Sequence, residues 1–144
     1  MDTPEEIKIW QRVRNEVPPV PDGLSGLAAN ALALAALYGN LVRQLPQGRK
    51  ILQQLQEETL SAARSLKGIY QLVTGVPMEV GAVPPTFENA QSALRKSYGQ
   101  SLKALRAYEA RESHPEYGCV FAQLAAAARR HCGWLTELMG LLGV

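Results

Sequence analysis

Apolar residues recur at alternating steps of three and four along most of the chain, the spacing that gives an α-helix one buried face. Four long segments carry this pattern, over residues 22–45, 49–73, 86–112 and 115–139. Helices of this length with one apolar side are stable when those sides are packed together. The pattern therefore predicts an all-α protein in which four helices surround one core.

The expected inward positions include several polar side chains, mostly on the third segment. They are Leu24, Leu27, Ala31, Leu34, Tyr38, Leu41 and Leu45 on the first helix; Leu52, Leu55, Thr59, Ala62, Leu66, Ile69 and Val73 on the second; Phe87, Gln91, Leu94, Tyr98, Ser101, Leu105 and Tyr108 on the third; and Phe121, Leu124, Ala128, His131, Leu135, Leu138 and Leu142 on the fourth. A buried polar group needs a hydrogen-bond partner.

The connections between the helices differ in length. A short turn, Pro46-Gln47-Gly48, makes the first two helices antiparallel neighbours. Residues 76–85, VPMEVGAVPP, carry proline at two sites and no helical period, which predicts a loop. At about 3.4 Å per residue this loop could span about 34 Å, nearly the length of a bundle.

A short helix is expected ahead of the bundle. Thr3-Pro4-Glu5-Glu6 combines an N-cap, a proline at the first helical position and a capping-box glutamate, and the helix is expected to continue to about Asn15. Prolines between Val17 and Pro21 make a stiff linker. We therefore divide the chain into an N-terminal helix with its linker, 1–21, and a four-helix bundle, 22–144.

Composition favours the same class and excludes some partners. Hydrophobic residues make up 47% of the 144 residues and the net charge is only +2, with basic and acidic residues interleaved, so no nucleic-acid partner is expected. The apolar stretch from Leu27 to Val42 is interrupted by Asn30, Gly39 and Asn40, so no membrane span is expected. The acidic, polar N-terminus lacks the pattern of a secretory signal and predicts a cytoplasmic protein.

The segment LQQLQEETLSAARSLKGIYQLVTG resembles helix B of the rubrerythrin-like proteins of the ferritin-like superfamily. Those proteins have Glu-Glu-x-x-His-Ala where this chain has Glu-Glu-Thr-Leu-Ser-Ala at residues 57–62. This resemblance, extended over residues 22–142, implies a ferritin-like four-helix bundle with a long crossover between its second and third helices. Those two helices would run parallel, joined by residues 76–85. A ferritin-like di-iron site takes one Glu from each of two helices and a Glu-x-x-His pair from each of the other two.

The two single glutamates implied by the resemblance are missing. In this family each stands seven residues before a tyrosine. Tyr38 is preceded at that distance by Ala31, and Tyr108 by Ser101. Both tyrosines therefore remain, and we expect them to be core residues.

Each Glu-x-x-His pair is also incomplete. The second helix keeps Glu58 but has Ser61 in place of histidine, and the fourth keeps His131 but has Ala128 in place of glutamate. Glu58 and His131 are thus the only two survivors of the six ligands. Ala31, Ser101, Ala128 and His131 lie on inward positions, and Glu58 and Ser61 lie beside the inward positions of their helix. We therefore expect all six to be interior sites.

One glutamate and one histidine cannot bridge and neutralise two iron ions. We expect no metal, no cofactor and no catalytic residue here, with Glu58 and His131 as residual metal-ligand candidates. The space vacated at Ala31, Ser61, Ser101 and Ala128 is expected to close, with a direct or one-water contact between Glu58 and His131.

Three functions remain open at this point. The first is a non-catalytic, degenerate ferritin-like bundle that serves as a binding or assembly module, with homodimerisation through exposed apolar helix surface as one form of it. The second is an atypical metal-binding oxidoreductase or peroxide-handling protein that uses Glu58, His131 and tyrosines. The third is a carrier whose small-molecule ligand occupies the vacated core. Fold alone does not choose among them.

Overall fold

The computed structural model describes residues 21–81 and 86–143, and within them it contains four α-helices and no strand. The helices are α2, Leu24–Gln44; α3, Arg49–Thr74; α4, Ala90–Glu109; and α5, Gly118–Leu141, with a short 3-10 helix, Pro46–Gly48, between α2 and α3. The all-α, four-helix prediction is confirmed. The expected N-terminal helix, from Thr3 to Asn15, lies outside the described residues.

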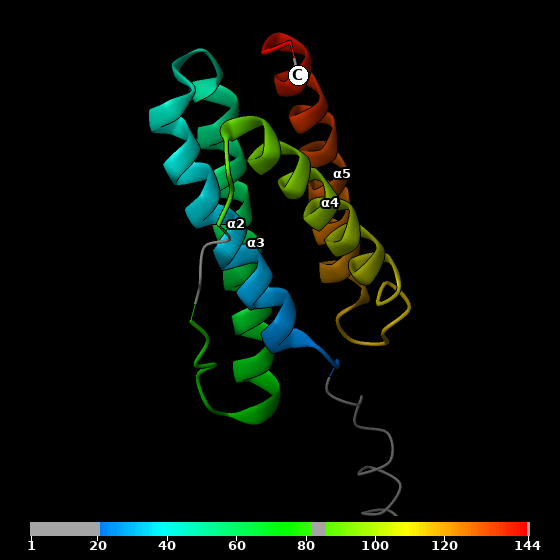
Figure 1. Cartoon of the computed structure of the whole chain (residues 1–144). Helices are drawn as coiled ribbons and strands as arrows, with labels where there is room; N and C mark the ends of the chain where they lie inside the picture. Colours follow the sequence, from blue (N-terminus) through cyan, green and yellow to red (C-terminus); the bar gives the residue numbers. More distant parts are fainter. Residues whose placement is uncertain (1–20, 82–85, 144) are drawn as a thin grey trace, which may run out of the picture.

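The helices pack as two hairpins, α2 with α3 and α4 with α5, and contacts within each hairpin far exceed those between them. Two core clusters fill the bundle, one toward each end. The first holds the start of α2, the end of α3, the end of α4 and the start of α5; the second holds the opposite halves. Because the C-terminal halves of α3 and α4 share one cluster, these two helices run in the same direction (Figure 1).

The connection between α3 and α4 returns the chain along the bundle. Met78, shortly after α3, is buried in the first cluster, whereas Phe87, shortly before α4, packs against the second. In Figure 1 the segment that follows α3 lies at the end of the bundle where α3 ends, and the segment that precedes α4 leads to the opposite end, where α4 begins. A parallel pair of helices needs such a long return, since a short turn can only join antiparallel neighbours.

Two helix starts differ from the prediction. The third helix was expected from Thr86 but begins at Ala90, because the Asn89 side chain accepts a hydrogen bond from the backbone N–H of Ser92 at 2.8 Å and caps the helix there. Gln91, expected to face inward, is exposed. Phe87, still ahead of the helix, packs against this end of the core in its place.

The fourth helix was expected from Pro115 but begins at Gly118. Nδ1 of His114 accepts hydrogen bonds from the backbone N–H groups of Glu116 and Tyr117, at 3.2 and 3.1 Å, which holds these residues in turns. A Cβ atom at Gly118 would collide with the carbonyl oxygen of Glu112. The tight entry into α5 therefore requires glycine at this position.

Helix α2 is as long and as apolar as a membrane-spanning helix. Among the described residues it is the one helix that could cross a membrane by length and composition, and 39% of its most apolar 18-residue window is buried inside the protein. Its inward side, from Leu24 to Leu41, supplies eight buried residues to the bundle. The core helix of a soluble protein meets the same criteria, and the absence of a membrane span stays a prediction.

Gly118 offers a test of the tight entry into α5. We expect Gly118→Ala to lower the free energy of unfolding by about 1–3 kcal/mol, because the backbone of Glu112 must move to admit the methyl group. Gly133→Ala on the same helix, where a Cβ meets nothing within 4 Å, should raise it by up to about 1 kcal/mol. Urea unfolding of both variants measures this, and equal effects would contradict the packing described.

Candidate functional site

The candidate site lies where the four helices meet at mid-height. Ala31 on α2, Ser101 on α4, and Ala128 and His131 on α5 are all buried, as expected. They line one small central cavity together with Tyr108. The positions that the family resemblance singled out on three of the four helices are therefore brought together in the folded chain.

Helix α3 contributes less than expected. Glu58 is partly buried, with 30% of its side chain exposed. Ser61 is exposed, so its interpretation as an interior site was wrong. The buried face of α3 runs through Thr59, Ala62 and Ala63, which turns Ser61 outward into a surface groove between α3 and α5 that Glu58 also lines.

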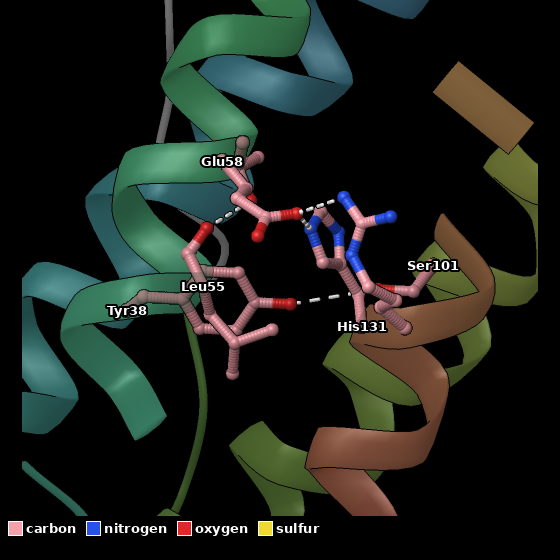
Figure 2. A network of polar contacts seen from close by, with 7 residues as sticks. Tyr38, Leu55, Glu58, Ser101 and His131 are labelled. Atoms are coloured by element: carbon pink, nitrogen blue, oxygen red, sulfur yellow. Dashed lines mark hydrogen bonds and ion pairs between the residues drawn. The ribbon is translucent and has the colours of Figure 1, made fainter. Parts of the chain in front are cut away.

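Glu58 makes the central polar contact of the site. Its Oε1 atom lies 3.1 Å from Nε2 of His131, and the direct contact expected from the sequence is confirmed. Nη2 of Arg130 donates a hydrogen bond to the same oxygen at 2.8 Å. Figure 2 shows the Glu58 carboxylate reaching from α3 toward His131 on α5. One carboxylate oxygen thus serves a guanidinium at the surface and an imidazole in the interior.

The protonation of His131 follows from its surroundings. Burial lowers the pKa of His131 below its ordinary value of 6.5, the neighbouring Glu58 acts in the opposite direction, and the charge of Arg130 again lowers the pKa. The imidazole is therefore neutral near pH 7. Its ring also lies against Trp134, with 5.8 Å between the ring centroids.

Tyr38 and Tyr108 are core residues, as expected. The Tyr38 side chain is fully buried and its hydroxyl lies 3.4 Å from Oγ of Ser101, a contact between α2 and α4 that Figure 2 also shows. Burial raises the pKa of Tyr38 to about 12 and that of Tyr108 to about 12. The Tyr108 ring lies 6.5 Å from the ring of Phe121. Both hydroxyl groups stay protonated at any physiological pH.

The central cavity is small. The space open to the centre of a water molecule is about 20 Å³, whereas pockets for drug-sized ligands have total volumes of about 300–1,000 Å³. A layer that held three larger side chains and two metal ions would need much more space than this. The cavity has room for about one water molecule.

The side chains at the site do not fit a di-iron centre. Alanine and serine stand at three buried positions where carboxylates would be needed, and Glu58 is already paired with Arg130. Residues 21–81 and 86–143 contain no group of three or more His, Cys, Asp or Glu side chains that could hold a metal ion. A cation beside Glu58 would also have to displace the guanidinium. The donor set therefore supports hydrogen bonding rather than metal chemistry.

Two residues of the site were missed in the sequence. Arg130 directly precedes His131, and an arginine next to an inward histidine is well placed to bind the same carboxylate as the histidine. Asn30 lines the central cavity from α2, and only its position next to the buried Ala31 could have indicated this.

No protein-family model, curated protein or solved structure matches this chain. The interpretation of the site therefore depends on its own residues and geometry.

His131 should contribute to stability through Glu58. We expect His131→Ala to lower the free energy of unfolding by about 1–3 kcal/mol, because the half-buried carboxylate loses its interior donor. His131→Gln retains a side-chain amide donor and should lose less. Urea unfolding at pH 7 compares them, and an alanine variant as stable as wild type would show that the contact carries no net energy.

The lowered pKa of His131 predicts a dependence of stability on pH. Protonation favours the unfolded chain, where the pKa is near 6.5, so His131 contributes stability that is present above pH 6.5 and lost as the pH falls through its folded pKa. We expect the urea midpoint of wild type to fall more steeply below pH 6.5 than that of His131→Gln. His114 and the carboxylates are common to both proteins, so parallel curves would contradict the assignment.

Proposed function

We propose that this chain is a ferritin-like bundle that has lost its di-iron site and acts without catalysis, as a binding or assembly module. The observation that carries this proposal is the Glu58 carboxylate bonded to Arg130 and His131 beside a layer of alanine and serine. Where a metal centre needs free carboxylates, this site offers one carboxylate, and protein donors already occupy it.

The helix order supports the ferritin-like part of the proposal. Ferritin-like bundles have one long crossover connection, and here α3 and α4 run in the same direction with a long return between them. The spacing of Tyr38 after Ala31 and of Tyr108 after Ser101 agrees with the same alignment, because Ala31, Ser101 and Tyr108 all line the central cavity.

The two other functions have weaker support. An oxidoreductase or peroxide-handling protein would need a metal, and the donor set described above does not suit one. A carrier that uses the vacated core would need space for its ligand, and the central cavity of about 20 Å³ has room for about one water molecule.

Metal analysis tests the proposal. Protein purified from iron-supplemented medium should contain well under one iron per chain and lack ferroxidase activity. Added Fe²⁺ or Mn²⁺ should leave its melting temperature unchanged, since a ligand that binds only the folded state must raise it. Stoichiometric iron with ferroxidase activity would refute the proposal.

Restoring the ligands tests the family assignment separately. The variant Ala31→Glu, Ser101→Glu, Ala128→Glu places carboxylates at the three buried positions around Glu58 and His131. It should bind Co²⁺ with the absorption of a protein-bound ion, and adding Glu58→Ala should weaken that binding. If the metal-free variant is unfolded because its core is overfilled, Co²⁺ should refold it, as metal binding is coupled to folding. A folded variant with no Co²⁺ binding would reject the alignment.

For the assembly role, we propose a homodimer formed through the outer face of α2. No charged residue occurs between Leu24 and Val42, and Leu32 is half-buried yet belongs to neither core cluster. An outer helix face without charge is favourable for contact with a second copy.

Light scattering during gel filtration tests the dimer. We expect wild type to give twice the chain mass at micromolar concentration and Leu32→Glu to give the mass of one chain. Leu72→Glu is the control, because Leu72 is also apolar and is 77% exposed at the end of α3. A monomeric wild type, or a dimer unaffected at Leu32, would exclude this interface.

A further inference from the structure

Two polar atoms of the central cavity need a hydrogen-bond partner. Ser101 already contacts Tyr38, and Thr59 donates to the carbonyl oxygen of Leu55. Within the described residues the Tyr108 hydroxyl and Nδ1 of His131 have no protein partner, yet no fully enclosed side-chain nitrogen or oxygen there lacks one. Neither atom is fully enclosed, and both side chains line the central cavity.

The chemistry of His131 defines what its Nδ1 needs. Oε1 of Glu58 accepts a hydrogen bond from the Arg130 guanidinium and also lies against Nε2 of His131, so we take Nε2 to donate to this same oxygen. Burial lowers the pKa of His131 and keeps the ring neutral. A neutral imidazole carries one proton, and that proton is on Nε2. Nδ1 is therefore an acceptor, and it requires a donor from within the cavity.

The size of the cavity selects the occupant. An ordered water needs about 10–15 Å³ of space for its centre and two to four polar partners, and the cavity offers about 20 Å³. Asn30, on the α2 side of the cavity, supplies a third polar group.

We propose that the cavity binds one ordered water molecule, which donates a hydrogen bond to Nδ1 of His131 and accepts one from the Tyr108 hydroxyl, with the Asn30 amide as a third partner. This water links α2, α4 and α5 at the level where the two hairpins meet. It extends the contact from Glu58 through His131 to Tyr108. The inference holds whether or not the bundle is ferritin-like.

The Tyr108→Phe variant separates a hydrated cavity from a dry one by the sign of its effect. If the hydroxyl bonds to water, its removal should lower the urea midpoint by about 0.5 M. If the cavity is dry, the substitution removes an unsatisfied hydroxyl and the midpoint should stay the same or rise, which would overturn the proposal. Tyr70→Phe is the matched control, because Tyr70 packs against the first core cluster and does not line this cavity.

Magnetic relaxation dispersion of the water signal tests the occupant directly. Wild type should show a contribution from a long-lived water, which Ala128→Val should abolish because the added methyl groups enter the cavity. Ala122→Val makes the same change on an exposed position of α5 and should keep it. No long-lived water in wild type, or one that persists in Ala128→Val, would overturn the proposal. If Ala128→Val does not fold, Tyr108→Phe still decides.

Discussion

The contact of Glu58 with Arg130 and His131 is what joins the two hairpins at their centre. Each hairpin is held by extensive packing of its own, and contacts between the hairpins are sparse. Leaving a half-buried carboxylate without hydrogen-bond donors destabilises the fold by more than an average hydrogen bond stabilises it. Because both donors come from α5, α3 must lie close to α5 for Glu58 to be satisfied. This requirement acts together with the two core clusters, each of which contains residues of all four helices, to set how the hairpins pack.

Small side chains make that approach sterically feasible. Ala31, Ser101 and Ala128 have small side chains, and the cavity that they line between α2, α4 and α5 has room for about one water molecule. An open void would cost about 24 cal/mol per Å³ of cavity, so closure is strongly favoured. Tyr38 and Ser101 then meet across α2 and α4 with 3.4 Å between their oxygens. The polar contacts of this layer thus depend on the small side chains around them.

The sequence predicts the helices well and their ends less well. The three-four spacing of apolar residues is repeated many times in each helix, so one misleading residue does not change the prediction of a helix. The start of a helix, in contrast, depends on a single capping residue. Asn89 supplies such a cap through a single hydrogen bond to Ser92, and nothing in the apolar pattern marks it. Ser61 shows the same limit at the site, because a rotation of one residue on α3 separates a position facing the core from one facing solvent. Arg130, at an exposed position, came within reach of Glu58 only through tertiary packing.

Charge balance explains why Glu58 and His131 form a stable hydrogen-bonded pair rather than part of a metal site. In a ferritin-like centre four glutamates would balance two divalent ions. On the proposed descent three of those carboxylates are gone, and one metal ion left with Glu58 would carry excess positive charge into a poorly hydrated layer. Arg130 supplies a single positive charge to the single carboxylate, and its guanidinium stays half exposed to water. With His131 neutral, the centre has no net charge, and any divalent cation that entered would have to break this balance.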